Sequence, residues 1–181
     1  MPWKTKSETT SPMNTLVPET DLAIKTLVQD YAAAWSELRA DAIAAHWDRS
    51  DPEPLYLAEE IPAPMVSWDE VDAYWAHNDD FHRKVRLDFG PPAIKHLGDG
   101  VACLVMEMNW QIAFRNFTSK AMAGSNRVLA VVRDTEEGWK FVSWVEAPLA
   151  PIMYFRNQYE NAVTPEFLSD IADEDQIHTE G

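Results

Sequence analysis

A glutamate at the end of an apolar run, Glu146, is the residue that the sequence best equips to carry protons. It follows the segment 139–145, whose residues are mostly apolar and typical of a buried strand. A carboxyl group held against apolar surface loses its water, which raises its pKa toward neutrality and makes it a usable acid or base. We expect Asn126 to lie opposite Glu146 and to polarise a carbonyl or hydroxyl group of a ligand. In the alternative interpretation, Glu146 faces water at the rim and Asn126 only caps the strand end.

Two tyrosines and two histidines are further candidates for the chemistry. Tyr31 and Tyr56 could each donate a hydrogen bond to an oxyanion, although both also fit as core tyrosines with bonded hydroxyl groups. His96, in an expected strand, and His46, at the end of an expected helix, could each act as a general base. The predicted catalytic residues are therefore Glu146, Asn126, Tyr31, His96 and His46.

Tryptophan is unusually abundant, with eight residues in the chain. Indole rings fill protein cores, and they also form flat walls around aromatic or polycyclic ligands. The sequence leaves both interpretations open. The residues predicted to bind such a substrate are Trp35, Tyr56, Trp75, Met108, Trp110 and Trp144.

The sequence predicts neither a metal site nor an organic cofactor. His77 and His82 bracket four residues that include two aspartates, but no His-Glu-x-x-His or equivalent ligand spacing occurs. The chain also lacks a Gly-rich phosphate loop and a dinucleotide fingerprint. We therefore expect proton-transfer chemistry without a cofactor.

Three long strands must position these residues. The segment 101–115 has apolar residues at its even-numbered positions and polar residues at most odd positions from Glu107 onward, as expected for a strand with one buried face. Segments 127–133 and 139–147 follow, joined by a short acidic loop typical of a hairpin. Pairing Arg133 with Trp139 would put Asn126 opposite Glu146. A slip of one residue would instead bury Glu107 and Asn109.

Helices precede this sheet. Apolar residues at helical spacing predict a first helix from residue 18, and a second helix is expected at 40–47. Ser67 and Glu70 form a capping box that opens a third helix. The order predicts an α+β fold with helices on one face of an antiparallel sheet. We expect a disordered tail at 1–17, a domain at 18–150, and a helical extension with an acidic end at 151–181.

Composition excludes several classes of function. The net charge of −15 and the absence of a basic stripe argue against binding to nucleic acid. No apolar run is long enough to span a membrane, and the start of the chain lacks a signal-peptide pattern. The single cysteine, Cys103, gives no disulfide framework. We therefore expect a cytoplasmic protein without membrane or nucleic-acid partners.

The order of these motifs resembles the nuclear transport factor 2-like (NTF2-like) superfamily, in particular its SnoaL-like branch. The resemblance spans about residues 20 to 150. It implies a cystatin-like curved antiparallel sheet wrapped around helices, with an internal pocket. The pattern often has histidine where this chain has Ser143 and Trp144, so no histidine role is carried over. The matching segments are Asp21–Ile24 with Tyr31 and Trp35, Asp41–Ile43 with Trp47 and Asp51, Val66–Val71, Gly98–Ala102 and Gly138–Trp144.

The residues and the resemblance together predict a cofactor-independent lyase, dehydratase or isomerase for a bulky aromatic or polycyclic compound. Relatives in the superfamily include ketosteroid isomerases, scytalone dehydratase and the diarylpropane lyases, whose aromatic substrates make them an attractive comparison. Two alternatives are a non-catalytic small-molecule-binding protein and a structural small subunit of a ring-hydroxylating oxygenase. We also expect a homodimer or homotrimer, because apolar residues recur on the second face of the sheet. These residues are Val105, Leu129, Val131 and Phe141.

Overall fold

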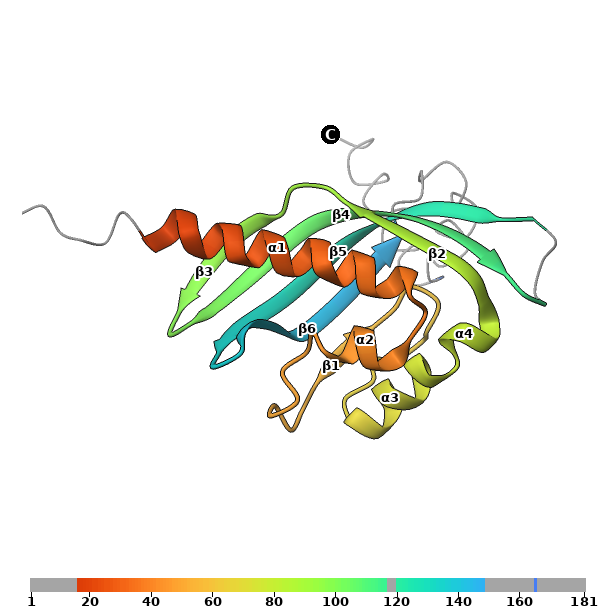
Figure 1. Ribbon diagram of the computed structural model, residues 1–181, viewed down its shortest axis with the longest axis horizontal. Helices are drawn as coiled ribbons and strands as arrows, with labels where there is room; N and C mark the ends of the chain where they lie inside the picture. The colour runs from red at the N-terminus through yellow and green to blue at the C-terminus, as the bar shows by residue number, and fades with distance from the viewer. Residues whose placement is uncertain (1–15, 117–119, 149–164, 166–181) are drawn as a thin grey trace, which may run out of the picture. The chain divides into compact units, whose positions relative to one another are not determined.

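The structure is a computed structural model that describes residues 16–116, 120–148 and 165. The chain divides into two units, Met1–Pro148 and Leu149–Gly181. Every helix and strand discussed below belongs to the first unit (Figure 1). Most of the predicted N-terminal tail and the predicted C-terminal extension lie outside the described residues, apart from Pro165.

The first unit is an α+β structure, as predicted, and its elements follow the expected order. The helices are α1 (Leu16–Ser36), α2 (Ala40–Ala44), α3 (Trp68–Ala76) and α4 (Asn78–Phe81). The strands are β1 (Leu55–Leu57), β2 (His82–Phe89), β3 (Ala93–Gly98), β4 (Val101–Phe114), β5 (Met122–Thr135) and β6 (Gly138–Pro148). The short helix α4 was not predicted from the sequence.

Local sequence signals explain the two longer helices. In α1, the residues Ile24, Val28, Tyr31 and Trp35 recur on one face and are all buried, which is the apolar stripe expected of a helix packed on a sheet. The predicted capping box starts α3, because Ser67 Oγ accepts a hydrogen bond from the Glu70 amide and the Glu70 carboxylate accepts one from the Ser67 amide.

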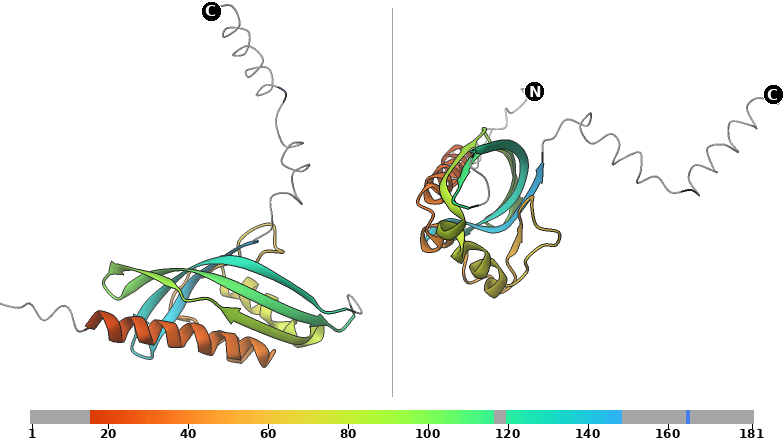
Figure 2. Two further views of the ribbon diagram at one scale, coloured as in Figure 1. Left: turned by 90° about the horizontal axis from the view of Figure 1, so that it is seen from above. Right: turned by 90° about the vertical axis from the view of Figure 1, so that its right-hand side faces the viewer.

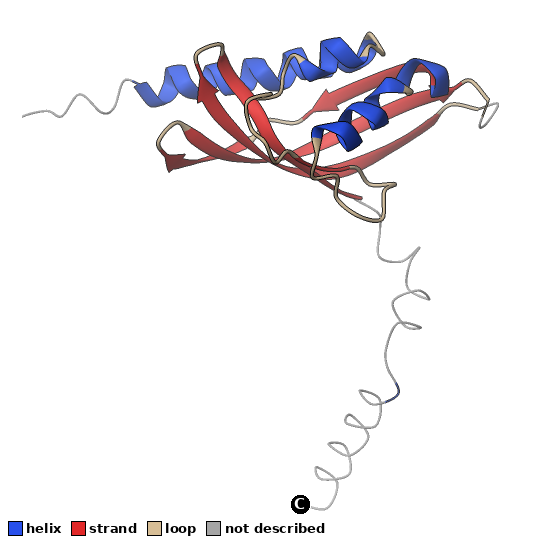
Figure 3. Cartoon of the chain, turned by 90° about the horizontal axis from the view of Figure 1, so that it is seen from below, coloured by secondary structure: helices blue, strands red, loops and turns tan. Residues whose placement is uncertain are grey.

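The strands form one curved sheet in the order β1-β6-β5-β4-β2, and β3 also pairs with β4. Strands β2 and β3 pair with different halves of β4, so a break at residues 90–92 divides one long edge into two strands. The helices lie on one face of the sheet (Figure 3). Viewed end-on, the sheet curls into an open arc beside α1 and α3 (Figure 2). This curvature leaves room for a cavity between the sheet and the helices.

The observed pairing of β5 with β6 differs from the predicted register, in part because of a bulge. Arg133 pairs with Lys140 rather than Trp139, and the register shifts again between Val131 and Val132. The shift changes which residues of β6 face inward, so Phe141 is fully buried and its predicted place on the outer face is wrong. Beyond the bulge, Glu146 pairs with Val128. Asn126 is therefore its diagonal neighbour rather than its direct partner.

The outer face of the sheet carries part of the predicted interface. Val105 and Leu129 pair across β4 and β5, and they are 49% and 44% exposed. Large apolar side chains exposed side by side are typical of a contact surface. Self-association through this face stays a prediction.

An irregular segment between α2 and β1 runs beside β6. Strand β1 itself is parallel to β6, so the sheet is mixed rather than wholly antiparallel. Trp47 bridges to Phe141 in parallel, and β1 pairs with β6 in parallel. Arg133 fixes this segment, since its guanidinium bonds Asp48 at 2.8 Å and Asp51 at 3.0 Å. The side chain of Asp48 is only 6% exposed, so the pair is partly withdrawn from water.

We expect Arg133→Met to lower the free energy of unfolding by about 1–3 kcal/mol, because it leaves the nearly buried Asp48 carboxylate without its cation. Urea denaturation at neutral pH measures this loss. Arg86→Met is the matched control, since the pair of Arg86 with Asp88 is exposed and such pairs contribute under about 1 kcal/mol. Equal losses for the two variants would contradict this account of Arg133.

Candidate active site

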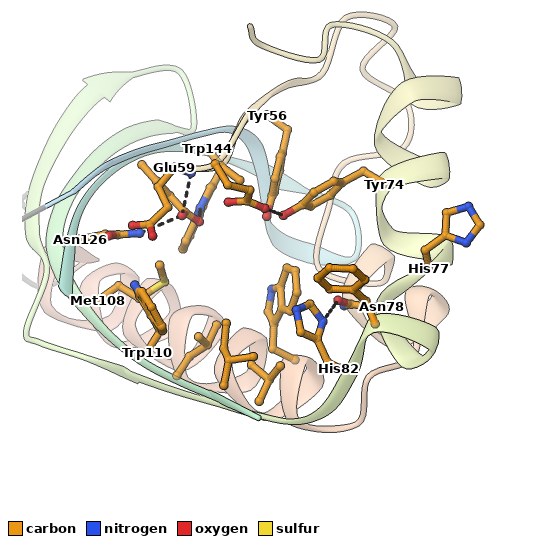
Figure 4. Close-up of a pocket in the computed structure, with 18 of the residues that line it drawn as sticks. Tyr56, Glu59, Tyr74, His77, Asn78, His82, Met108, Trp110, Asn126 and Trp144 are labelled. Carbon is orange, nitrogen blue, oxygen red and sulfur yellow. Dashed lines mark hydrogen bonds between the residues drawn. The ribbon is translucent and has the colours of Figure 1, made fainter. Parts of the chain in front are cut away.

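A cavity of about 580 Å³ lies within the first unit, bordered by the curved sheet and by α3 and α4 (Figure 4). Its volume is that of a typical small-molecule site. Most of its wall is apolar and aromatic. The principal apolar lining residues are Trp35, Met108, Trp110, Ile112, Phe114 and Trp144.

Glu146 lies in the wall of this cavity and is held by three neutral donors. Asn126 Nδ2 donates to its Oε2 at 2.9 Å, and Trp144 Nε1 donates to its Oε1 at 2.8 Å. The backbone N–H of Glu59 makes a longer bond of 3.4 Å to Oε2. Among the described residues, no lysine or arginine pairs with this carboxyl group. Its negative charge is therefore solvated by dipoles alone.

This environment tunes Glu146 for proton transfer. Burial raises the pKa of Glu146 to about 7, and the nearby carboxylates of Glu60 and Glu59 add to the rise. The hydrogen bonds from Trp144 and the Glu59 amide favour the ionised form and oppose the shift. At neutral pH both forms of the carboxyl group are therefore populated, which suits an acid and a base equally.

Two further carboxyl groups that the sequence did not identify line the same cavity. Glu59 and Glu60 follow β1 in an irregular loop. Burial raises the pKa of Glu59, and repulsion from Glu60 adds to the shift. Tyr74, on α3, donates its hydroxyl hydrogen bond to Glu60. This part of the cavity wall is therefore acidic.

A hydrogen-bonded pair of a histidine and an asparagine lies on another side of the cavity. His82, at the start of β2, bonds the side chain of Asn78 through Nδ1 at 2.8 Å. Figure 4 shows His82 and Asn78 on one side of the cavity, with Asn126 and Glu59 on the other. Within the part of the chain that the structure describes, no group of three or more His, Cys, Asp or Glu residues is arranged to hold a metal ion.

The structure brings many of the predicted site residues together. Glu146 and Asn126 lie in the same wall of the cavity and are joined by a hydrogen bond, although the register of their strands differs from the predicted one. The predicted substrate-binding residues that line the cavity are Trp35, Tyr56, Met108, Trp110 and Trp144.

Four predicted residues lie outside the cavity lining. Tyr31 is fully buried against Trp144, with ring centroids 5.1 Å apart, and its hydroxyl has no hydrogen-bond partner among the described residues. Trp75 is a core residue that packs on Trp47. His46 bonds the Ala42 carbonyl within its own helical turn. His96 pairs with Asp21 of α1 at 2.8 Å. These interactions assign the four side chains to packing and to tertiary contacts.

Gly124 positions one of the cavity tryptophans. It pairs with Trp110 across β4 and β5, and a Cβ atom at residue 124 would lie 2.5 Å from Trp110 Cζ2. Such a distance is too short for two carbon atoms, so any side chain at residue 124 must displace the indole ring. The glycine therefore allows the ring to lie against β5.

We expect Gly124→Ala to weaken the binding of bulky arenes at least about fivefold and to destabilise the protein by about 1–3 kcal/mol, because overpacking forces Trp110 out of place. Ligand titration and urea denaturation measure the two effects. Gly90→Ala is the matched control, since a Cβ there would meet its nearest atom at an ordinary 3.7 Å. Unchanged affinity in Gly124→Ala would show that the position of Trp110 does not matter for binding.

Comparison with solved structures identifies the fold. A candidate aromatic ring hydroxylase from Novosphingobium aromaticivorans matches with a TM-score of 0.65 and 19% identity, covering 74% of this chain and 92% of that one. A candidate scytalone dehydratase from the same organism matches with a TM-score of 0.65 and 12% identity, covering 74% of this chain and 89% of that one. An NTF2-like superfamily protein from Salmonella enterica matches with a TM-score of 0.64 and 15% identity, covering 75% of this chain and 94% of that one. Other matches are described as having a cystatin-like fold. The predicted fold class is confirmed.

Sequence comparisons add no closer relative. No protein-family model matches the sequence, and neither does a curated protein. Within residues 16–116 and 120–148, no helix is long and apolar enough to cross a membrane. The cavity and its side chains are therefore the features that bear on function.

Proposed function

We propose that this protein is a cofactor-independent acid–base enzyme, a lyase, dehydratase or isomerase, that acts on a bulky aromatic or polycyclic small molecule. The observation that carries the proposal is the carboxyl group of Glu146, which has a pKa of about 7 in the wall of an apolar cavity. A carboxylate retained for stability would be expected to face a cation. Glu146 instead faces neutral donors and open space, which is the arrangement of a group that exchanges a proton with a ligand.

The two forms of Glu146 provide complementary chemistry. The carboxylate can remove a proton from a carbon atom that is activated by a neighbouring carbonyl group or aromatic ring, and the carboxylic acid can protonate a departing oxygen atom. A positioned acid or base of this kind contributes about a hundred- to ten-thousand-fold in rate. The tryptophan walls would orient a flat substrate beside the carboxyl group and exclude water.

The comparisons support this proposal in general terms. One protein with this fold is described as a candidate aromatic ring hydroxylase, and two others as candidate dehydratases. Those names concern the hydroxylation of aromatic rings and dehydration. Because fold alone does not determine function, the specific proposal rests on Glu146 and its surroundings.

The charge of the cavity predicts which ligands it accepts. Its described lining residues include Glu59, Glu60 and Glu146 but no lysine or arginine. We expect methyl 2-naphthoate to bind at least about tenfold more tightly than 2-naphthoate at pH 8, because the anion would meet like charges at low local dielectric. Quenching of tryptophan fluorescence measures both affinities, and naphthalene controls for the shared ring system. Equal affinity for the ester and the anion would contradict this selectivity.

A general probe of base catalysis tests the proposed function without knowledge of the substrate. In 5-nitrobenzisoxazole, a base removes the proton on the ring carbon, the electron pair forms a nitrile, and the N–O bond breaks to release a coloured phenolate. We expect the protein to accelerate this elimination above the buffer rate, with a rate that rises as pH increases through about 7. The rise follows from the sign of the titration, because only the ionised carboxylate is a base.

Two results would overturn the proposed function. One is a rate equal to that of buffer at every pH, and the other is a rate that does not respond to pH near 7. Tight binding of neutral arenes together with no elimination would favour the small-molecule-binding protein instead. Thermal-shift measurements with the same arenes separate that case from an empty cavity, because a ligand at a hundredfold excess over its dissociation constant stabilises the fold by about 2.7 kcal/mol.

A further inference from the structure

The imidazole of His82 is fixed in one orientation on the cavity wall. Its Nδ1 lies 2.8 Å from Asn78 Oδ1, and Asn78 is only 5% exposed. Since an amide oxygen can only accept a hydrogen bond, Nδ1 must carry the proton. The lone pair of the neutral ring is then on Nε2, and Figure 4 shows this nitrogen on the cavity side of the ring.

Aromatic packing and one backbone contact hold this arrangement. The ring of His82 packs against Phe81 and Phe114, with centroid distances of 5.6 and 5.4 Å. The guanidinium of Arg115 donates to the backbone carbonyl of His82 at 3.1 Å. The ring is therefore positioned as tightly as Glu146, but from β2 and α4 rather than from β5 and β6.

The surroundings keep the ring neutral. Burial lowers the pKa of His82, while a hydrogen bond with the backbone of Asn78 and the charge of Glu60 oppose this shift. The other charged or titratable groups nearby are Tyr74 and His77, which border the same cavity, and Arg115, which contacts the backbone of His82. At pH 7 the ring is consequently a base with a free lone pair.

We propose that His82 is a second catalytic residue of this site, a base that works across the cavity from Glu146 in the elimination of water from a bound alcohol. This inference rests on the proposed function and narrows it to a dehydratase. Two proton carriers on different walls of one cavity can act on different atoms of one substrate. The buried Asn78 is the positioning residue that sets the tautomer of His82.

The proposed step balances without a cofactor. His82 Nε2 accepts the proton from the carbon atom next to the one that bears the hydroxyl group. The electron pair of the broken C–H bond forms the C=C bond, and the C–O bond breaks. The departing oxygen takes the proton of the Glu146 carboxylic acid and leaves as water. Transfer of the proton from the imidazolium ion to the Glu146 carboxylate, through solvent, restores both groups.

Nitrogen NMR of the ligand-free wild-type protein tests the tautomer directly. Long-range correlation spectra of ¹⁵N-labelled histidine distinguish a protonated Nδ1 from a protonated Nε2. We expect His82 to be neutral at pH 7 with its proton on Nδ1. A proton on Nε2, or a ring that is charged at pH 7, would overturn the inference whatever the function of Glu146.

Elimination of 5-nitrobenzisoxazole then tests the base in a Glu146→Gln background. We expect His82→Gln to lower the remaining rate at least about tenfold at pH 7.5. His96→Gln is the matched control, because His96 pairs with Asp21 of α1 and is not among the residues that line the cavity. An unchanged rate in the double variant would remove His82 from the mechanism and leave the proposed function standing. If His82→Gln alone abolishes the wild-type rate and Glu146→Gln does not lower it, the assignment of Glu146 fails and His82 is the base.

Discussion

Replacing Glu146 by Gln is expected to lower the rate of base-catalysed elimination about a hundred- to ten-thousand-fold, because the amide cannot accept the proton. Gln keeps the shape of the side chain, and its amide group can bond the Asn126 Oδ1 atom, which has no hydrogen-bond partner among the described residues. The fold should therefore be retained. Stopped-flow or plate absorbance of the released phenolate measures the rate across the pH range.

Glu107→Gln is the matched control for this variant. Glu107 is an exposed carboxylate on the opposite face of the sheet, where it pairs with Arg127 across β4 and β5. It is also the carboxylate that the alternative register would have placed in the pocket. A loss of rate in Glu107→Gln equal to that in Glu146→Gln would contradict the assignment of the base.

Glu146→Gln should also change how stability depends on pH. The carboxyl group has a folded pKa of about 7, above its ordinary 4.5, so the folded state holds this proton after the unfolded state has lost it. The contribution of Glu146 to stability therefore falls as pH rises from about 4.5 to 7, by about 3 kcal/mol in total. We expect Glu146→Gln to remove this fall and to be more stable than wild type above pH 7, as measured by urea denaturation.

Trp144→Ala is expected to cost about 3–5 kcal/mol of unfolding free energy, the largest stability effect at the site. The indole is 1% exposed and packs against Tyr31 and Phe141, with centroid distances of 5.1 and 5.3 Å. Its removal would open a large void between α1 and the sheet. Denaturation with urea at pH 6 measures this loss.

Trp144→Phe separates packing from hydrogen bonding. It keeps most of the buried ring but removes the Nε1 donor that bonds Glu146 at 2.8 Å. Because that bond favours the carboxylate, we expect the pKa of Glu146 to rise above its wild-type value of about 7. The pH-rate profile should move in the same direction. An unmoved profile would show that Trp144 acts only as packing.

The sequence was most informative where periodicity was strong. The alternation in residues 101–115 correctly identified the inward face of β4, because a single buried face requires a period of two. The capping box at Ser67 located the start of α3 for a similarly local reason. The bulge in β6 was not visible in the sequence, since it depends on pairing with β5, and it turned Phe141 inward.

The site was predictable in part for the same reasons. Glu146 and Asn126 were expected together because both lie at the open end of the predicted hairpin. Although the register differs from the predicted one, the two side chains are diagonal neighbours and still form a hydrogen bond. Glu59 and Glu60 lie in an irregular loop, and only the fold brings that loop to the cavity. His82 was noted in the sequence, but the short helix α4, which precedes it and carries its partner Asn78, has no periodic signal.

The pKa of Glu146 is the quantity on which this account most directly depends. Carbon NMR of protein labelled with ¹³C at the glutamate carboxyl carbons, assigned by comparison with Glu146→Gln, follows this one group through a pH titration. The account predicts a midpoint of about 7. A midpoint near the ordinary 4.5 would mean that Glu146 is a solvated carboxylate at the rim, and the proposed acid–base function would lose its central residue.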